Sequence, residues 1–340
     1  GGGSVRRAQR LQVRQILRHL HQQDPDRFIT ECEAALTSGD IRFHIKETVV
    51  AVIANLAAPT YQEAELVLRV CAKPGSVTTR MWPQLRRPEW FARLHKDGVL
   101  EAWLDSAIQA DRERAVLCLG SHARGDLAPI AEILKARSMA ADYPDWLRWV
   151  VRFGDLGTSR DMFDLLLDAV RAGLFDGGYE KQLWISVRDI GEKEPLWAIE
   201  LLRAFLVERA GAMDLDVGGK VAVLKMRDDS ASEVVRQAAE AEPLAFAAMA
   251  VPYLRAVMAA TAREPSDNGH VYDEHFSLRM VGSERYERNL DEALLGATVV
   301  ALENLAASSP EDIRPMLQTL ADDPYESSEY LLYRTLTAGG

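Results

Sequence analysis

Two histidines and two carboxylates lie close together in the stretch REPSDNGHVYDEHFSLRMVGSERYERN, residues 263–289. They are His270, Asp273, Glu274 and His275. Imidazole and carboxylate groups bind Zn²⁺, so the cluster first suggests a metal site. Its spacing matches no established zinc pattern, and the stretch is polar and contains Pro265 and two glycines. We therefore expect neither a metal nor another cofactor here.

The same stretch contains the aromatic, Met and Arg side chains that protein interfaces favour. We interpret it as an insertion that projects from the helices and contacts a protein partner. A disordered linker is the alternative, because the stretch is also rich in polar residues, Gly and Pro. The candidate partner-binding residues are His270, Tyr272, Asp273, His275, Phe276, Arg279, Arg285 and Tyr286.

A second candidate for chemistry is RMWPQLRRPEWFARLHK, residues 80–96, which mixes arginines with aromatic residues. Nucleic-acid grooves use cations for phosphates and aromatic rings for base stacking. Trp90, Leu94 and Leu100, however, recur at a helical spacing. We therefore favour a helix whose aromatic side chains pack inward. Nucleic-acid binding stays an alternative, and only for the N-terminal third of the chain.

The glycine-rich DVGGKVAV, residues 216–223, resembles a phosphate-binding loop only superficially. It lacks the first glycine four residues upstream and the Ser or Thr after Lys220. It is better interpreted as a turn between helices. The sequence also shows no GxSxG, HExxH or protein-kinase signature, so we predict no enzyme activity for this chain.

The elements that must position these residues are helices. Sustained alternation of polar and apolar residues is absent, whereas apolar residues recur at helical spacing throughout, so the fold class is all-α. Helices open repeatedly after short polar turns, several of them at a proline in the first turn. Gaps of 33–37 residues or about twice that recur, which predicts two-helix repeats stacked into an α-solenoid. The openings are Pro25, Thr60, Asp126, Ser159, Pro195, Pro243 and Pro310.

The stretch RFHIKETVVAVIANLAAPT, residues 42–60, combines a basic–aromatic–His opening with an apolar run. On a helical wheel, Val49 and Ile53 share one face, while Phe43 and Val50 share the opposite face. A helix that is apolar on both sides is buried on both sides. We expect Asp40 to cap this helix and His44 to be packed rather than catalytic, because no nucleophile lies at a usable spacing.

Composition and charge disfavour several classes of protein. The net charge is −11, but residues 1–100 carry 15 Lys/Arg against 10 Asp/Glu, and the remainder carries 25 against 41. This acidic excess disfavours nucleic acid as the main partner. We see no uncharged apolar run long enough to span a membrane and no signal peptide. Cys32, Cys71 and Cys118 are far apart, as expected for thiols of a cytoplasmic protein.

The residues Arg42-Phe43-His44-Ile45-Lys46, followed by Pro59-Thr60 and Glu63, resemble a pattern of bacterial STAND-type NTPases. In that family, R-[FY]-H-[LIV]-K and P-T-x-x-E occur in the helical repeats that follow the nucleotide-binding module. Many members are antiphage defence proteins, in which the repeats sense a foreign protein and the ATPase then oligomerises and activates an effector. This chain has no Walker motif, so the family's ATP-binding residues have no counterpart here.

The resemblance implies that the chain is a sensor region for a protein ligand, and the antiphage members of the family imply a phage-derived one. The NTPase and effector modules would lie outside it, on the side of the basic N-terminus. We expect residues 1–4 to be an added linker, 5–262 the solenoid, 263–289 the insertion and 290–336 terminal repeats of the same solenoid. Two alternatives remain: a helical-repeat scaffold that binds a cellular protein, and a nucleic-acid-binding repeat domain. A Walker A motif upstream in the gene would favour the STAND interpretation.

The isolated chain is predicted neither to bind nor to hydrolyse ATP. A phosphate cradle needs the backbone N–H groups of a glycine-rich loop together with a lysine, and the sequence lacks that arrangement. Calorimetric titration with Mg-ATP should therefore give only heats of dilution. Binding with micromolar affinity would contradict this prediction.

Overall fold

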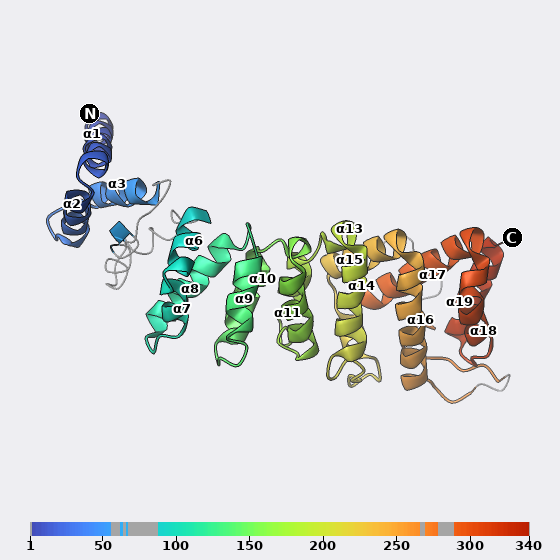
Figure 1. Ribbon diagram of the computed structural model, residues 1–340. Helices are drawn as coiled ribbons and strands as arrows, with labels where there is room; N and C mark the ends of the chain where they lie inside the picture. The colour runs from blue at the N-terminus through green and yellow to red at the C-terminus, as the bar shows by residue number, and fades with distance from the viewer. Residues whose placement is uncertain are drawn as a thin grey trace. The chain divides into compact units, whose positions relative to one another are not determined.

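The computed structural model describes residues 2–55, 62, 63, 66, 88–265, 269–277 and 289–339. The chain divides into two compact units, residues 1–154 and 155–340, and each is described by itself. Helices account for the regular structure in both units, and the described residues form isolated β-bridges but no strands (Figure 1). The prediction of an all-α chain is confirmed.

In its described residues, the first unit has a group of three helices and a group of five. α1 packs on α2 and α3, and these two helices also contact each other. In the second group α8 contacts α6, α7 and α10, while α9 contacts α10. The bounds are α1 Gly2–Gln23, α2 Pro25–Thr37, α3 Phe43–Ala54, α6 Pro88–Lys96, α7 Val99–Leu104, α8 Gln109–His122, α9 Ala128–Lys135 and α10 Tyr143–Phe153.

The second unit has two rows of helices (Figure 1). α13, α15, α17 and α19 contact one another in succession, and so do α14, α16 and α18. Each helix from α13 to α19 also contacts the next one along the chain. The bounds are η2 Leu156–Thr158, α11 Arg160–Arg171, α12 Glu180–Ser186, α13 Ile190–Lys193, α14 Pro195–Arg203, the π-turn η3 Ala204–Glu208, η4 Ala222–Lys225, α15 Asp229–Ala241, α16 Pro243–Ala260, α17 Leu290–Ser308, α18 Pro310–Ala321 and α19 Glu326–Ala338.

Most of the predicted helix openings that lie in the described residues are confirmed. A proline is the first residue of α2, α14, α16 and α18, where its missing N–H leaves no hydrogen bond unmade. Ser159 caps α11, and its side chain accepts a hydrogen bond from Met162 N. Asp126 accepts one from Ala128 N, one residue before the N-cap position of α9. Thr60 lies outside the described residues.

The helix α3 is buried on both sides, as predicted. Val49 and Ile53 on one face and Val50 and Ala54 on the other are all buried. Phe43, which shares a face with Val50, remains 37 % exposed. The predicted cap at Asp40 is wrong, because α3 starts after Arg42 and has no side-chain cap.

The helix α16 is long and apolar enough to cross a membrane, and half of it is buried inside the unit. A core helix of a folded unit has the same length and composition. Here α16 contacts α14, α15, α17 and α18. Its Arg255 forms a double hydrogen bond with Asp323, which lies just after α18. These contacts account for its apolar character by packing alone.

Two serines at helix starts offer a direct test of capping. Ser159 accepts the backbone hydrogen bond described above, whereas Ser309, at the N-cap of α18, makes none with its side chain. Ser159→Ala should therefore lower the free energy of unfolding by about 1 kcal/mol, and Ser309→Ala should change it by less than about 0.5 kcal/mol. Chemical denaturation measures both. Equal losses in the two variants would contradict the capping assignment.

Candidate functional site

The stretch that the sequence marks as an insertion begins directly after α16 and lies against the start of α19. We call residues 261–277 the polar segment. Arg263 N donates to Tyr272 O at 2.7 Å, and Glu274 N donates to Thr261 O at 2.9 Å. Val271 exchanges two backbone hydrogen bonds with the chain at Pro324 and Glu326. The described part of the segment is therefore attached to the unit by its backbone.

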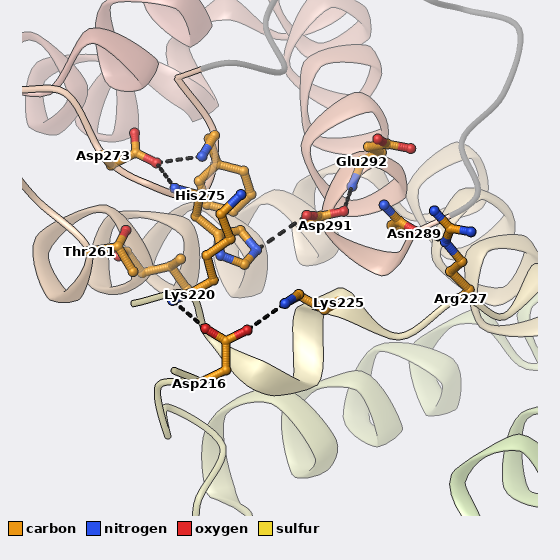
Figure 2. Close-up of polar contacts among 12 residues, drawn as sticks. Asp216, Lys220, Lys225, Arg227, Thr261, Asp273, His275, Asn289, Asp291 and Glu292 are labelled. Atoms are coloured by element: carbon orange, nitrogen blue, oxygen red, sulfur yellow. Dashed lines mark hydrogen bonds and ion pairs between the residues drawn. The ribbon is translucent and has the colours of Figure 1, made fainter. Parts of the chain in front are cut away.

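Asp273 is the centre of this attachment. Its side chain is buried, and Oδ1 accepts hydrogen bonds from the backbone N–H groups of His275 and Phe276 (Figure 2). Oδ2 accepts from the hydroxyls of Ser277 at 3.1 Å and Ser327 at 2.6 Å. A buried carboxylate needs such donors, because an unpaired one is strongly destabilising. Asp273 therefore fixes the turn that follows it and ties that turn to α19.

His275 and Asp291 form a buried pair beside this turn. His275 Nε2 lies 3.3 Å from Asp291 Oδ2, and both side chains are fully buried (Figure 2). Asp291 belongs to the first turn of α17, and its Oδ1 accepts from Glu292 N. Removing one member of a buried pair generally costs more than the pair contributes, because the other member is left unpaired in the interior. This pair is therefore part of the core.

Three of the predicted partner-binding residues need correction. Asp273, His275 and Phe276 are buried, so they hold the polar segment in place and do not form a contact surface. The expectation that this stretch projects is accordingly wrong for these residues, because Phe276 packs with no exposed surface.

The other predicted residues differ among themselves. Tyr272 is 40 % exposed, and the half-exposed His270 lies 3.3 Å from Glu329 in α19. Arg279, Arg285 and Tyr286 lie outside the described residues.

The glycine-rich stretch 216–223 is a turn, as predicted. Asp216 accepts hydrogen bonds from the backbone N–H groups of Gly218 at 2.8 Å and Lys220 at 3.0 Å, and Lys225 donates to its other oxygen (Figure 2). These contacts lower the pKa of Asp216 to about 2, and the hydrogen bond from Lys225 contributes most. The N–H groups that a phosphate would need are thus already bound to a carboxylate of the same turn.

Nucleophilic catalysis needs a histidine beside a Ser, Thr or Cys side chain, or a reactive thiol, and the described histidines and cysteines bear on both. Four histidines in the described residues pair with carboxylates: His21 with Glu63, His95 with Glu101, His270 with Glu329 and His275 with Asp291. The ring nitrogens of His21 and His95 hydrogen-bond these carboxylates. Burial raises the pKa values of Cys32 and Cys118 to about 12, so both thiols stay protonated and unreactive at neutral pH. The described residues also contain no group of three possible metal ligands.

The aromatic side chains of the basic stretch 80–96 pack inward where they are described. Trp90 and Leu94 of α6 have no exposed surface, and Phe91 is also buried. Arg93 pairs with Asp97 at 2.6 Å. The preferred interpretation as a packed helix is confirmed for this part. Arg80, Trp82, Arg86 and Arg87 lie outside the described residues.

The residues that carry the STAND resemblance have structural roles. The Lys46 ammonium donates to the carbonyls of Leu36 and Ser38, at the C-terminal end of α2. Cations are favourable there because the last carbonyls of a helix are unpaired and its dipole is negative. Glu63 is buried and lies 2.7 Å from His21 of α1. Pro59 and Thr60 lie outside the described residues.

Two surface grooves with apolar floors were missed by the sequence analysis. One lies between α8 and α10, has a volume of about 480 Å³, and includes Trp146 and Trp149 in its wall. The other, of about 360 Å³, lies between η3 and α16 and includes Met213 and Met249. Their residues come from helices far apart in sequence, so no local motif marks them. Leu117 of α8 is 41 % exposed, and no pattern in the sequence distinguishes it from its buried neighbours Cys118 and Leu119.

Comparison with known proteins gives no relative for this chain: no family model, curated protein or solved structure matches it. The function must therefore be argued from the geometry above.

Adjacent residues 273 and 274 provide a matched test of the polar segment. Asp273→Ala should lower the free energy of unfolding by about 3 kcal/mol, because it removes a buried acceptor and leaves two backbone N–H groups and two hydroxyls unpaired. Glu274→Ala removes only a surface pair with Arg263 and should leave the melting temperature nearly unchanged. Circular-dichroism melts compare the two. If the two variants melt alike, Asp273 does not anchor the segment.

Proposed function

We propose that this chain is a protein-recognition module built from helix pairs stacked as an α-solenoid. In this proposal it is the sensor portion of a bacterial STAND-type NTPase, located in the cytoplasm. It binds a foreign protein, such as one from a phage, and binding triggers ATP-dependent oligomerisation through NTPase and effector modules that lie outside this sequence.

The contact pattern of the second unit supports the solenoid. Helices two apart along the chain contact each other in each of two rows, and consecutive helices join the rows. In a solenoid each repeat contacts only its neighbours, which produces this pattern. Binding surfaces then arise from side chains that several repeats contribute.

The observation that carries recognition of a protein is the groove between α8 and α10. Its floor includes the indole of Trp146 and the side chains of Val116 and Leu117, while its rim is charged. Protein interfaces combine an apolar, aromatic centre with a polar rim. A small-molecule site would enclose its ligand more fully and would place convergent polar groups inside it.

The STAND assignment itself rests on the short resemblance around Arg42–Lys46 and Glu63. A scaffold that binds a cellular protein would use the same fold and the same grooves, and it remains the second candidate. The two differ in the source of the partner and in the presence of an NTPase module encoded upstream. The excess of carboxylates favours either of them over a nucleic-acid-binding domain.

Co-expression with individual phage proteins tests this proposal. The tagged chain is expressed with each gene product of a phage panel, and complexes are isolated by affinity and size-exclusion chromatography. We expect one phage protein to co-elute. We also expect its affinity to fall less than about tenfold when NaCl is raised from about 50 to about 200 mM, because nucleic-acid binders lose far more over that interval.

Two outcomes would contradict the sensor proposal. A partner found only among host proteins would favour the cellular scaffold. Binding of DNA or RNA that weakens by about a thousandfold or more over the same salt interval would favour the nucleic-acid alternative. The Asp273→Ala variant is unsuitable as a negative control here because its expected loss of stability could by itself weaken binding. Glu274→Ala serves as a folded surface control.

A further inference from the structure

The two helices that border the α8–α10 groove approach each other closely at Gly120. A Cβ atom at position 120 would lie 2.4 Å from Cδ1 and Nε1 of Trp149. Such a contact is impossible without movement, so only glycine lets the indole of Trp149 lie against α8. The indole also packs edge-on against Phe153, with ring centroids 5.2 Å apart. Trp149 is therefore held as a rigid wall of the groove.

The floor of the groove is apolar. Trp146 is 3 % exposed and closes the bottom, and Val116 of α8 borders it. Leu117 on the same helix is 41 % exposed. An aliphatic side chain of a partner that covers these groups removes apolar surface from water, which is the main source of affinity at such sites.

The rim of the groove carries more carboxylates than cations. Among its described residues, Glu113, Asp142 and Asp145 are acidic and Arg112 is the basic one. Arg112 is already engaged, because its Nε donates to Asp142 at 2.6 Å and its NH1 donates to Ser106 O at 2.7 Å.

The other two carboxylates are open to solvent. Glu113 is exposed and accepts a hydrogen bond from the neutral amide of Gln109. Asp145 pairs with Arg148 at 2.9 Å, but its side chain is still 76 % exposed. The negative charge of the rim is therefore carried chiefly by Glu113, next to the indole of Trp149.

We propose that this groove binds a segment of a protein partner in which an aliphatic residue stands next to a Lys or Arg. The aliphatic side chain covers Trp146 and Leu117, and the cation lies beside Glu113 and Asp145. The inference rests on the proposed function and extends it: it specifies which residue types of the partner bind in the α8–α10 groove.

Charge complementarity selects this occupant over others. An acidic segment or a nucleic-acid backbone would meet the carboxylates of the rim and be repelled. A wholly apolar segment would remove water from Glu113 without supplying a cation for it. A segment with an aliphatic and a basic residue covers the apolar floor and pairs its cation with the carboxylates of the rim.

Short synthetic peptides test the groove without an identified partner. The probe is an acetylated, amidated peptide with neighbouring Leu and Lys residues in a Gly-Ser background. Two controls replace Lys by Glu or Leu by Ala. Binding is followed by NMR through the indole N–H signal of Trp149, which is assigned with the Trp149→Phe variant. We expect the Leu-Lys peptide to shift this signal in a saturable manner and both controls to bind at least about fivefold more weakly.

Matched charge reversals locate the cation. Glu113→Lys should weaken binding of the Leu-Lys peptide by about fivefold and should improve binding of the Leu-Glu peptide. Glu132→Lys introduces the same charge change at an exposed position of α9 outside the groove lining, so it should leave both affinities unchanged. Melting temperatures verify that both variants are folded.

Three results would overturn the proposal: equal binding of the Leu-Glu peptide, equal effects of Glu113→Lys and Glu132→Lys, or no shift of the Trp149 signal with any peptide. These outcomes concern the groove alone. Capture of a phage protein by the chain could succeed while they occur, in which case the partner binds elsewhere. Failure of capture together with saturable Leu-Lys binding would instead contradict the phage-sensor assignment and retain the groove.

Discussion

The second unit depends on one constraint: a helix that is apolar on all sides must be covered by other helices on all sides. α17 is apolar around nearly its entire circumference, with Leu294, Leu302 and Leu305 among its buried residues. A helix of this kind is stable in water only if neighbours cover every side. α15, α16, α18 and α19 supply that cover. Since burying a single Leu contributes about 1.5–3 kcal/mol, removal of any one neighbour would expose more than a marginally stable domain tolerates.

The same constraint decides where a partner has room to bind. Where neighbouring helices pack side by side, most of their apolar surface is buried, and only the spaces between them leave some of it exposed. The grooves between α8 and α10 and between η3 and α16 are such spaces. The polar segment has the side chains that most suggest chemistry, but Asp273 and His275 make contacts inside the unit. A cluster of polar residues in a sequence can therefore hold a segment in place just as well as it can form a binding site.

Features that depend on neighbouring residues could be read from the sequence, whereas features that depend on distant ones could not. Pro25, Pro195, Pro243 and Pro310 mark helix starts because a proline's effect on the first turn is local. The role of Asp273 was hidden because its partner Ser327 is 54 residues away. The groove at Gly120 and Trp149 was hidden for the same reason, since a glycine within a helical pattern says nothing about which ring it faces.

The attachment of the polar segment also bears on the order in which the second unit assembles. Asp273 reaches Ser327 across 54 residues, and Arg255 reaches Asp323 across 68. Contacts between consecutive helices close short loops, whereas these two must overcome a larger loop-closure entropy before they gain any energy. During synthesis, α16 leaves the ribosome well before residues 323–327, so Arg255 and Asp273 lack Asp323 and Ser327 until that part of the chain has emerged. Until then, water must solvate the exposed polar groups, and the incomplete unit is the form most open to misfolding.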